Sequence, residues 1–234
     1  MRRGLTAALA LLALVGCRAG PTSAADKPEV HVLTSLPLLF EEGFGLESAK
    51  SEAAIFLREH YHLKPIDLPS QLPKGGLLLA AQPRALPAEE LVALDAWVRS
   101  GGKLLLLADP LLEWPSERAL GDRLRPPVSF ADTGLLLHWG LRLDAPDKRG
   151  LKPFRTAHAQ VEFVSPGRLK KVSGPCLIDV YDDIVAECKI GAGGVLVIAD
   201  ADWLDDETVE NAGGDPDNNL SLLLVALVSV GSAK

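Results

Sequence analysis

The sequence predicts an α/β fold, a mostly parallel sheet flanked by helices, with a small antiparallel β insert. Two short runs, residues 77–81 and 103–110, have the apolar centres expected of strands buried on both faces. A segment of helical periodicity separates them, and such a unit implies a right-handed crossover between parallel strands. Apolar residues make up 47% of the chain and aromatic residues only 5%, which favours a Leu/Val/Ala-rich core over a β-sandwich lined with rings.

The helix between these two strands has signals at both ends. Pro87 suits a first helical turn, and Glu89 and Glu90 follow where acidic side chains complement the helix dipole. Gly101-Gly102 ends the helix after Ser100. The face expected to pack on the sheet carries Leu91, Leu94, Trp97 and Val98.

The other elements follow from periodicity and turn residues. Before this unit we expect a strand at residues 30–36, a helix at 47–60 and a strand at 64–68. After it we expect a short helix at 135–141, a turn at 191–194, a buried strand at 195–200, and a helix at 220–230 capped by Asn218-Asn219. The antiparallel insert is predicted at residues 159–190, which hold β-like runs at 161–164, 176–180 and 184–188.

The N-terminus predicts export. Arg2 and Arg3 precede an apolar run that ends at Gly16-Cys17, the pattern of a secretory signal. The sequence Leu-Val-Gly-Cys resembles the lipobox of bacterial lipoproteins, which implies cleavage before Cys17 and acyl chains, such as palmitate, on that residue. We therefore expect a signal peptide at residues 1–16, a lipidated tether at 17–28 and one α/β domain at 29–231. The domain would face the periplasm from the cell membrane or the outer membrane.

The net charge limits the classes of binding partner, and the cysteines indicate the redox compartment. A net charge of −7 disfavours nucleic acid and anionic headgroups, so the link to the membrane should be the lipid. In an oxidising compartment Cys176 and Cys188 are expected to form a disulfide. A hairpin turn centred on Asp182 would place them opposite each other, whereas a two-residue turn at Asp182-Asp183 would pair Cys176 with Lys189 instead.

Motifs for covalent catalysis are absent from the sequence. No Gly-x-Ser-x-Gly or Gly-x-Cys-x-Gly elbow occurs, and Gln82 and Pro83, which follow the strand at 77–81, are not nucleophiles. No Walker motif occurs either, so ATP hydrolysis would come from another subunit. The basic run Arg168, Lys170 and Lys171 is expected to be a solvated strand or turn, with an anion site as the alternative.

Aspartates at strand ends are the candidate site. Asp109, Asp200 and Asp202 follow predicted parallel strands, and ligands bind at the carboxyl ends of such strands. With residues 205–207 nearby, their oxygens could hold Mg²⁺ or Ca²⁺. The simpler interpretation assigns Asp109 to a turn before Pro110 and makes Asp202 a cap of the local backbone. We favour the simpler interpretation, with no cofactor.

Three passages resemble a known family. They are PAEELVALDAWVRSGGKLLLLAD (87–109), GLLLHWGLRL (134–143) and GGVLVIADADW (193–203), the last followed by the Asn218-Asn219 helix. They are similar to the extracytoplasmic auxiliary domain of gliding-motility G-type ABC transport components. The resemblance implies a glutamine amidotransferase-like or flavodoxin-like fold and ABC permease or ATPase subunits as partners.

The sequence thus favours a non-catalytic, lipid-anchored binding or scaffold domain beside an ABC-type transport or motility system. Two alternatives stay open. One is a metal-dependent periplasmic hydrolase that uses Asp109, Asp200 and Asp202, and the other is a small-ligand binding protein that feeds a transporter.

Overall fold

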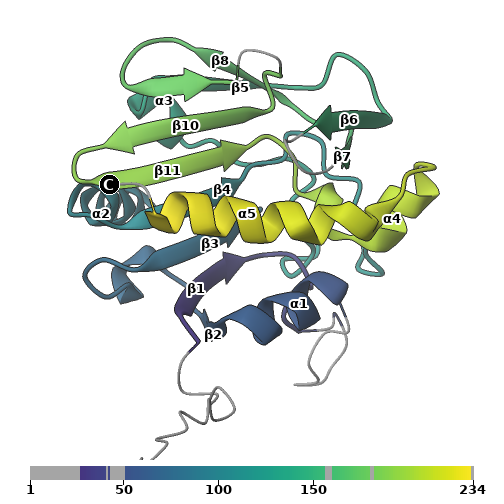
Figure 1. Cartoon of the computed structure of the whole chain (residues 1–234), viewed down its shortest axis with the longest axis horizontal. Helices are drawn as coiled ribbons and strands as arrows, with labels where there is room; N and C mark the ends of the chain where they lie inside the picture. Colours follow the sequence, from purple (N-terminus) through teal and green to yellow (C-terminus); the bar gives the residue numbers. More distant parts are fainter. Residues whose placement is uncertain (1–26, 41, 43–50, 156–159, 180–181, 233–234) are drawn as a thin grey trace, which may run out of the picture.

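A seven-stranded sheet organises the chain in the computed structural model, which describes residues 27–40, 42, 51–155, 160–179 and 182–232. The predicted signal peptide, Cys17 and most of the predicted tether lie outside these residues. The strand order is β2–β1–β3–β4–β11–β10–β9 (Figure 1). The bounds are β1 (Glu29–Thr34), β2 (His62–Pro65), β3 (Leu77–Ala81), β4 (Lys103–Leu107), β9 (Cys176–Ile178), β10 (Val185–Ile190) and β11 (Gly193–Ile198).

Parallel pairing joins β2, β1, β3, β4 and β11, whereas β10 and β9 pair antiparallel. The mostly parallel α/β architecture predicted from the sequence is therefore confirmed. Helix α1 (Glu52–His60) connects β1 to β2, and α2 (Ala88–Arg99) connects β3 to β4. These connections cross the sheet in opposite directions, so right-handed crossovers place the two helices on opposite faces. In Figure 1, α1 and α5 (Asn219–Ser232) lie in front of the sheet and α2 lies behind it.

Helix α2 packs as its sequence predicts. Leu94, Trp97 and Val98 are buried, and Leu91 is half-buried against the core. The helix ends in a close contact, since a Cβ added to Gly102 would lie 2.4 Å from the Trp97 ring. The Trp97 indole N–H donates to the carbonyl of Pro73 at 2.7 Å, which fixes the ring there. A glycine is therefore required where the chain enters β4.

Helix α1 and strand β2 begin at other residues than the sequence predicts. α1 begins at Glu52, where the Ser51 hydroxyl accepts a hydrogen bond from the Ala54 N–H at 3.4 Å. Residues 47–50 of the predicted helix lie outside the described part of the chain. β2 begins at His62 rather than at residue 64, because His62 donates its N–H to Pro28 at 2.9 Å and pairs with Glu29.

The described strands within residues 160–190 all pair antiparallel, as predicted for the insert, but they do not form a single unit. β10 and β9 extend the main sheet, while β7 (Gln160–Val164) and β8 (Arg168–Lys171) find partners outside the predicted range. These partners are β6 (Leu151–Arg155) and β5 (Leu141–Asp144), so two small antiparallel sheets result. Helix α3 (Leu135–His138) is shorter than predicted because Gly140, at φ 88°, turns the chain into β5.

The last helix is wholly uncharged and begins one residue earlier than predicted. Asn219 is buried at its start: its amide accepts from the Glu162 N–H at 3.0 Å and donates to the carbonyl of Trp203 at 3.1 Å. Asn219 thus ties α5 to β7 and to the turn after β11. Within the described residues, no helix is both long and apolar enough to cross a bilayer.

Candidate functional site at the carboxyl ends of the strands

The fold brings the three predicted aspartates together. Leu107 of β4 pairs with Ile198 of β11, so Asp109 and Asp200 lie equally far beyond the paired ends. One carboxylate oxygen each from Asp109, Asp200 and Asp202 lies within 4.8 Å of the others. All three side chains are 0% exposed. The strand ends thus gather three carboxyl groups away from solvent.

Backbone N–H groups occupy every oxygen of these carboxyl groups. Asp109 accepts from Leu111 at 2.7 Å, as in an Asx turn, and from Ala201 at 3.0 Å. Asp200 accepts from Val164 and from Asp202, both at 2.7 Å.

Asp202 completes the set with two bonds to the loop that follows β4. It accepts from Glu113 and from Trp114, both at 2.7 Å. The three side chains therefore bind together the ends of β4, β7 and β11, three segments distant in sequence. The bond from Leu111 to Asp109 agrees with the predicted local turn, whereas Asp202 holds a distant loop and not the local backbone that the simpler interpretation assigned to it.

Burial raises the pKa of all three carboxyl groups. It raises the pKa of Asp109 to about 6, although the N–H groups of Ala201 and Leu111 oppose the shift. Burial, with the nearby charge of Asp109, raises the pKa of Asp202 to about 8. The pKa of Asp200 lies well above its ordinary value because of burial and the charges of both neighbours. Burial therefore favours the protonated forms of these carboxyl groups up to a higher pH than for exposed aspartates.

A hydrolytic metal centre fits this donor set poorly. Mg²⁺ and Ca²⁺ take six or more oxygen ligands, and catalytic ions keep positions open for water or substrate. Asp109, Asp200 and Asp202 could each direct one oxygen at a common ion. However, all six oxygens already accept N–H bonds, and the complete burial of the three side chains leaves no approach for water.

The residue after β3 has the backbone of a nucleophile elbow without a nucleophile. Gln82 is buried with φ 43°, the kind of strained turn on which such enzymes place a reactive side chain. Its amide instead donates to the carbonyls of Asp109 at 3.0 Å and Pro127 at 3.1 Å, and accepts from the Asp109 N–H at 2.9 Å. The sequence identified Gln82 as unreactive, and the structure gives it a bridging role.

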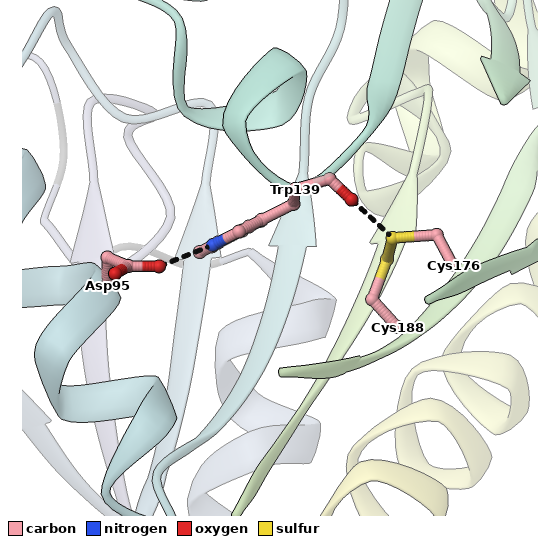
Figure 2. The surroundings of a disulfide bond; sticks show 4 residues. All are labelled: Asp95, Trp139, Cys176 and Cys188. Carbon is pink, nitrogen blue, oxygen red and sulfur yellow. Dashed lines mark hydrogen bonds between the residues drawn. A yellow bond between two sulfur atoms is a disulfide. The ribbon is translucent and has the colours of Figure 1, made fainter. Parts of the chain in front are cut away.

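Cys176 and Cys188 form a disulfide between β9 and β10 (Figure 2). The register pairs the two residues directly, as a turn centred on Asp182 requires, with their Cα atoms 4.0 Å apart. The sulfur of Cys176 lies 3.3 Å from the carbonyl oxygen of Trp139. The indole of Trp139 donates to Asp95 of α2 at 2.8 Å, so the disulfide lies at one end of a chain of contacts that reaches the helix.

The other acidic and basic residues considered from the sequence lie apart from this cluster. Asp205 begins α4 (Asp206–Asn211), and its carboxylate accepts from the Thr208 N–H at 3.0 Å. Arg168 and Lys170 lie in β8 and form ion pairs with Asp183 and with Asp144, both at 2.6 Å. A group of cations around residues 147–152 was missed by the sequence reasoning, although the run Asp-Lys-Arg-Gly at 147–150 marked it.

Solved structures of several differently named proteins have a similar fold. The N-terminal domain of mmIFT52 superposes with a TM-score of 0.55 and 15% identity, over 88% of this chain and 98% of that one. Cytoplasmic protein STM3548 from Salmonella typhimurium gives 0.54 and 9%, over 86% and 98%. The exo-β-1,4-mannosidase Op5Man5 from Opitutaceae bacterium strain TAV5 gives 0.50 and 17%, over 86% of this chain but only 36% of the mannosidase. At these identities the likeness concerns the fold alone.

Sequence comparison is more specific. No curated protein matches the chain. A family model described as "ABC-type uncharacterized transport system" matches residues 27–147, just over half of the sequence, and covers β1 to β5. The chain therefore belongs to this family of auxiliary domains of ABC-type transport systems.

Proposed function

We propose that this chain is a non-catalytic, lipid-anchored domain that binds or scaffolds the subunits of an ABC-type transport system outside the cytoplasm. Family membership supports the transport system. The signal-like segment that ends at Cys17 supports the anchor and the export. The disulfide between Cys176 and Cys188 is in keeping with an oxidising compartment, at the cell membrane or the outer membrane.

The non-catalytic part of the proposal is supported by the contacts of the side chains at the strand ends. In an open α/β sheet these ends hold the reactive groups. Here Asp109, Asp200 and Asp202 are buried and saturated by backbone N–H groups, and Gln82 stands at the elbow. A site whose polar groups are all engaged in holding the fold leaves binding as the function of the domain.

We further propose that the domain is a variant of the glutamine amidotransferase-like or flavodoxin-like fold. The strand order β2–β1–β3–β4–β11 supports this, because flavodoxin-type sheets have the order 2-1-3-4-5. The positive φ of Gln82 supports it too, since the elbow conformation is kept at the end of β3.

The experiment is co-purification from the native membrane. The full-length chain, tagged at its C-terminus, is extracted in mild detergent and its partners are identified by mass spectrometry. We expect an ABC permease and ATPase at near-equal amounts. Recovery of the intact chain with no ABC subunit above a mock purification would contradict the proposal.

Fractionation tests the anchor separately. Cys17→Ser should move the protein from the membrane to the soluble fraction, because the acyl chains can no longer be attached. Ser23→Ala, a change in the same predicted tether, should leave it in the membrane. A membrane-bound Cys17→Ser protein would show that another feature anchors the chain.

A metal-dependent hydrolase remains the second candidate, because Asp109, Asp200 and Asp202 do lie within ligand distance of a common point. A divalent ion retained through dialysis, together with turnover that needs it, would favour this candidate over the scaffold.

A further inference from the structure

A cavity of about 500 Å³ opens beside β6, and Asp109, Asp200 and Asp202 are not among the residues that line it. Its volume falls within the range of small-molecule sites, about 300–1,000 Å³. Four cationic side chains line it, Lys148, Arg149, Lys152 and Arg168, against two carboxylates, Asp147 and Asp183. The excess of positive charge is local, because the chain as a whole carries a net charge of −7.

One wall of the cavity is fixed by the backbone. Gly150 and Ser165 bond to each other twice: the Gly150 N–H donates to the Ser165 hydroxyl, and the Ser165 N–H donates to the Gly150 carbonyl, both at 2.9 Å. Ser165 is buried at φ 50°, and its hydroxyl donates to Glu113 at 2.7 Å. A strained residue that is held by three hydrogen bonds makes the adjoining Pro166, which lines the cavity, a rigid part of the wall.

Two of the four cations are already positioned. Arg168 is held between Asp147 and Asp183, with its Nε 2.6 Å from the Asp183 carboxylate. Lys152 lies 3.7 Å from Asp183 and also contacts Asp182. These pairs neutralise Arg168 and Lys152 in part and fix their direction.

Lys148 and Arg149 differ from these two. Neither forms an ion pair with any carboxylate in the described part of the chain, and both side chains are exposed at the cavity. A guanidinium and an ammonium side by side offer a charge-assisted donor set suited to phosphate oxygens.

We propose that this cavity binds the phosphate group of a small molecule or a lipid headgroup, with Lys148 and Arg149 as the residues that contact it. Arg168 and Lys152, which are paired with Asp147, Asp182 and Asp183, form the fixed wall beside them. This inference goes beyond the proposed scaffold role and does not depend on the anchor at Cys17. The residues that line the cavity do not include Asp109, Asp200 or Asp202, so the inference requires no particular role of the aspartate cluster.

The test is a calorimetric titration of the full-length chain in a non-ionic detergent. The probes are inorganic phosphate and glycerol 3-phosphate. We expect binding that weakens as NaCl is added, because exposed charges are screened. In Lys148→Gln/Arg149→Gln the affinity should fall about tenfold, the sum expected for the loss of two exposed ion pairs to phosphate.

A charge-matched control separates a site from general attraction. Arg123→Gln/Lys171→Gln removes two cations from exposed positions outside the cavity lining, and should leave the affinity unchanged. For the lipid source, Cys17→Ser protein is mixed with phosphatidylcholine vesicles with and without phosphatidylglycerol.

We call Lys148→Gln/Arg149→Gln the cavity variant and Arg123→Gln/Lys171→Gln the control variant. If only the cavity variant loses binding to inorganic phosphate or glycerol 3-phosphate, the ligand is a small molecule. Phosphatidylglycerol-dependent vesicle binding lost only in that variant supports a headgroup. Absence of binding to every probe, or equal losses in the cavity and control variants, would overturn the proposal. The two proposals can fail separately. If the chain binds phosphate but no ABC subunit co-purifies with it, the result supports this inference and contradicts only the scaffold role.

Discussion

The aspartate cluster should make the protein less stable as pH rises from about 4.5 to about 8. In the folded state, burial raises the pKa of Asp109 to about 6 and that of Asp202 to about 8, from an ordinary 3.8. A group whose folded pKa is raised binds its proton more tightly in the fold than in the unfolded chain. Its contribution to stability is therefore complete below pH 3.8 and is lost as pH rises through the folded value.

The size of the effect follows from the shift. The Asp109 shift alone, at about 1.4 kcal/mol for each pH unit, corresponds to about 3 kcal/mol. Asp202 and Asp200 act in the same direction, and so does Asp205, whose pKa burial also raises. The ion-paired carboxylates Asp95, Asp144 and Asp147 have lowered pKa values, so their contribution changes only below pH 4. Above pH 4.5 these three ion-paired carboxylates therefore add little to the change in stability.

Urea unfolding, monitored by tryptophan fluorescence, measures the free energy of unfolding at each pH, since Trp139 and Trp203 are buried in the core. We expect the free energy of unfolding to fall by a few kcal/mol between pH 4.5 and pH 8. Asp109→Asn should be less stable at pH 4.5, because an amide has a single acceptor oxygen and cannot accept both the Leu111 and the Ala201 N–H, and it should show a smaller fall. Stability that stays flat or rises with pH, and rises further with Mg²⁺, would show that the carboxylates are ionised and neutralised by a cation.

Three further changes test the packing. Leu94→Ala should cost about 2–5 kcal/mol of unfolding free energy, whereas Val92→Ala, at a side chain 69% exposed, should stay within about 0.5 kcal/mol, both read from urea denaturation. Gly193→Ala should cost about 3 kcal/mol or more, because its Cβ would lie 2.0 Å from a carbonyl oxygen of α2; wild-type stability would show that β11 and α2 are further apart. Reduction of the Cys176–Cys188 bridge should cost about 3 kcal/mol, and two free thiols in unreduced, exported protein by mass spectrometry would contradict the bond.

The parallel half of the sheet could be predicted because its signals are local. Residues 77–81 and 103–107 are apolar on both faces, and the helix between them carries its own start and stop residues. The positions of Asp109 and Asp200 followed from the same logic, since parallel strands in register end at the same edge.

The antiparallel pairings could not be predicted in the same way. β6, with the sequence Leu-Lys-Pro-Phe-Arg, lacks an apolar pattern and is formed by its pairing with β7. The pairing of β8 with β5 is likewise set by distant segments, so local periodicity shows only that a strand is plausible.

The role of the aspartates depended on non-local contacts as well. Asp202 bonds to Glu113 and Trp114, and Asp200 bonds to Val164, across long stretches of sequence. A carboxylate at a strand end has the same sequence signal whether it holds a metal or a loop. Only the N–H groups around each oxygen distinguish the two.

The central claim is that the strand ends hold the fold and carry no reaction. The most direct test is a hydrolase screen of the full-length protein with amide, ester and nucleotide substrates, with and without Mg²⁺, Mn²⁺ and Ca²⁺. We predict no turnover above buffer under any of these conditions. Metal-dependent turnover that disappears in Asp109→Asn, in protein whose circular dichroism matches the wild type, would contradict the claim and assign the cluster to catalysis.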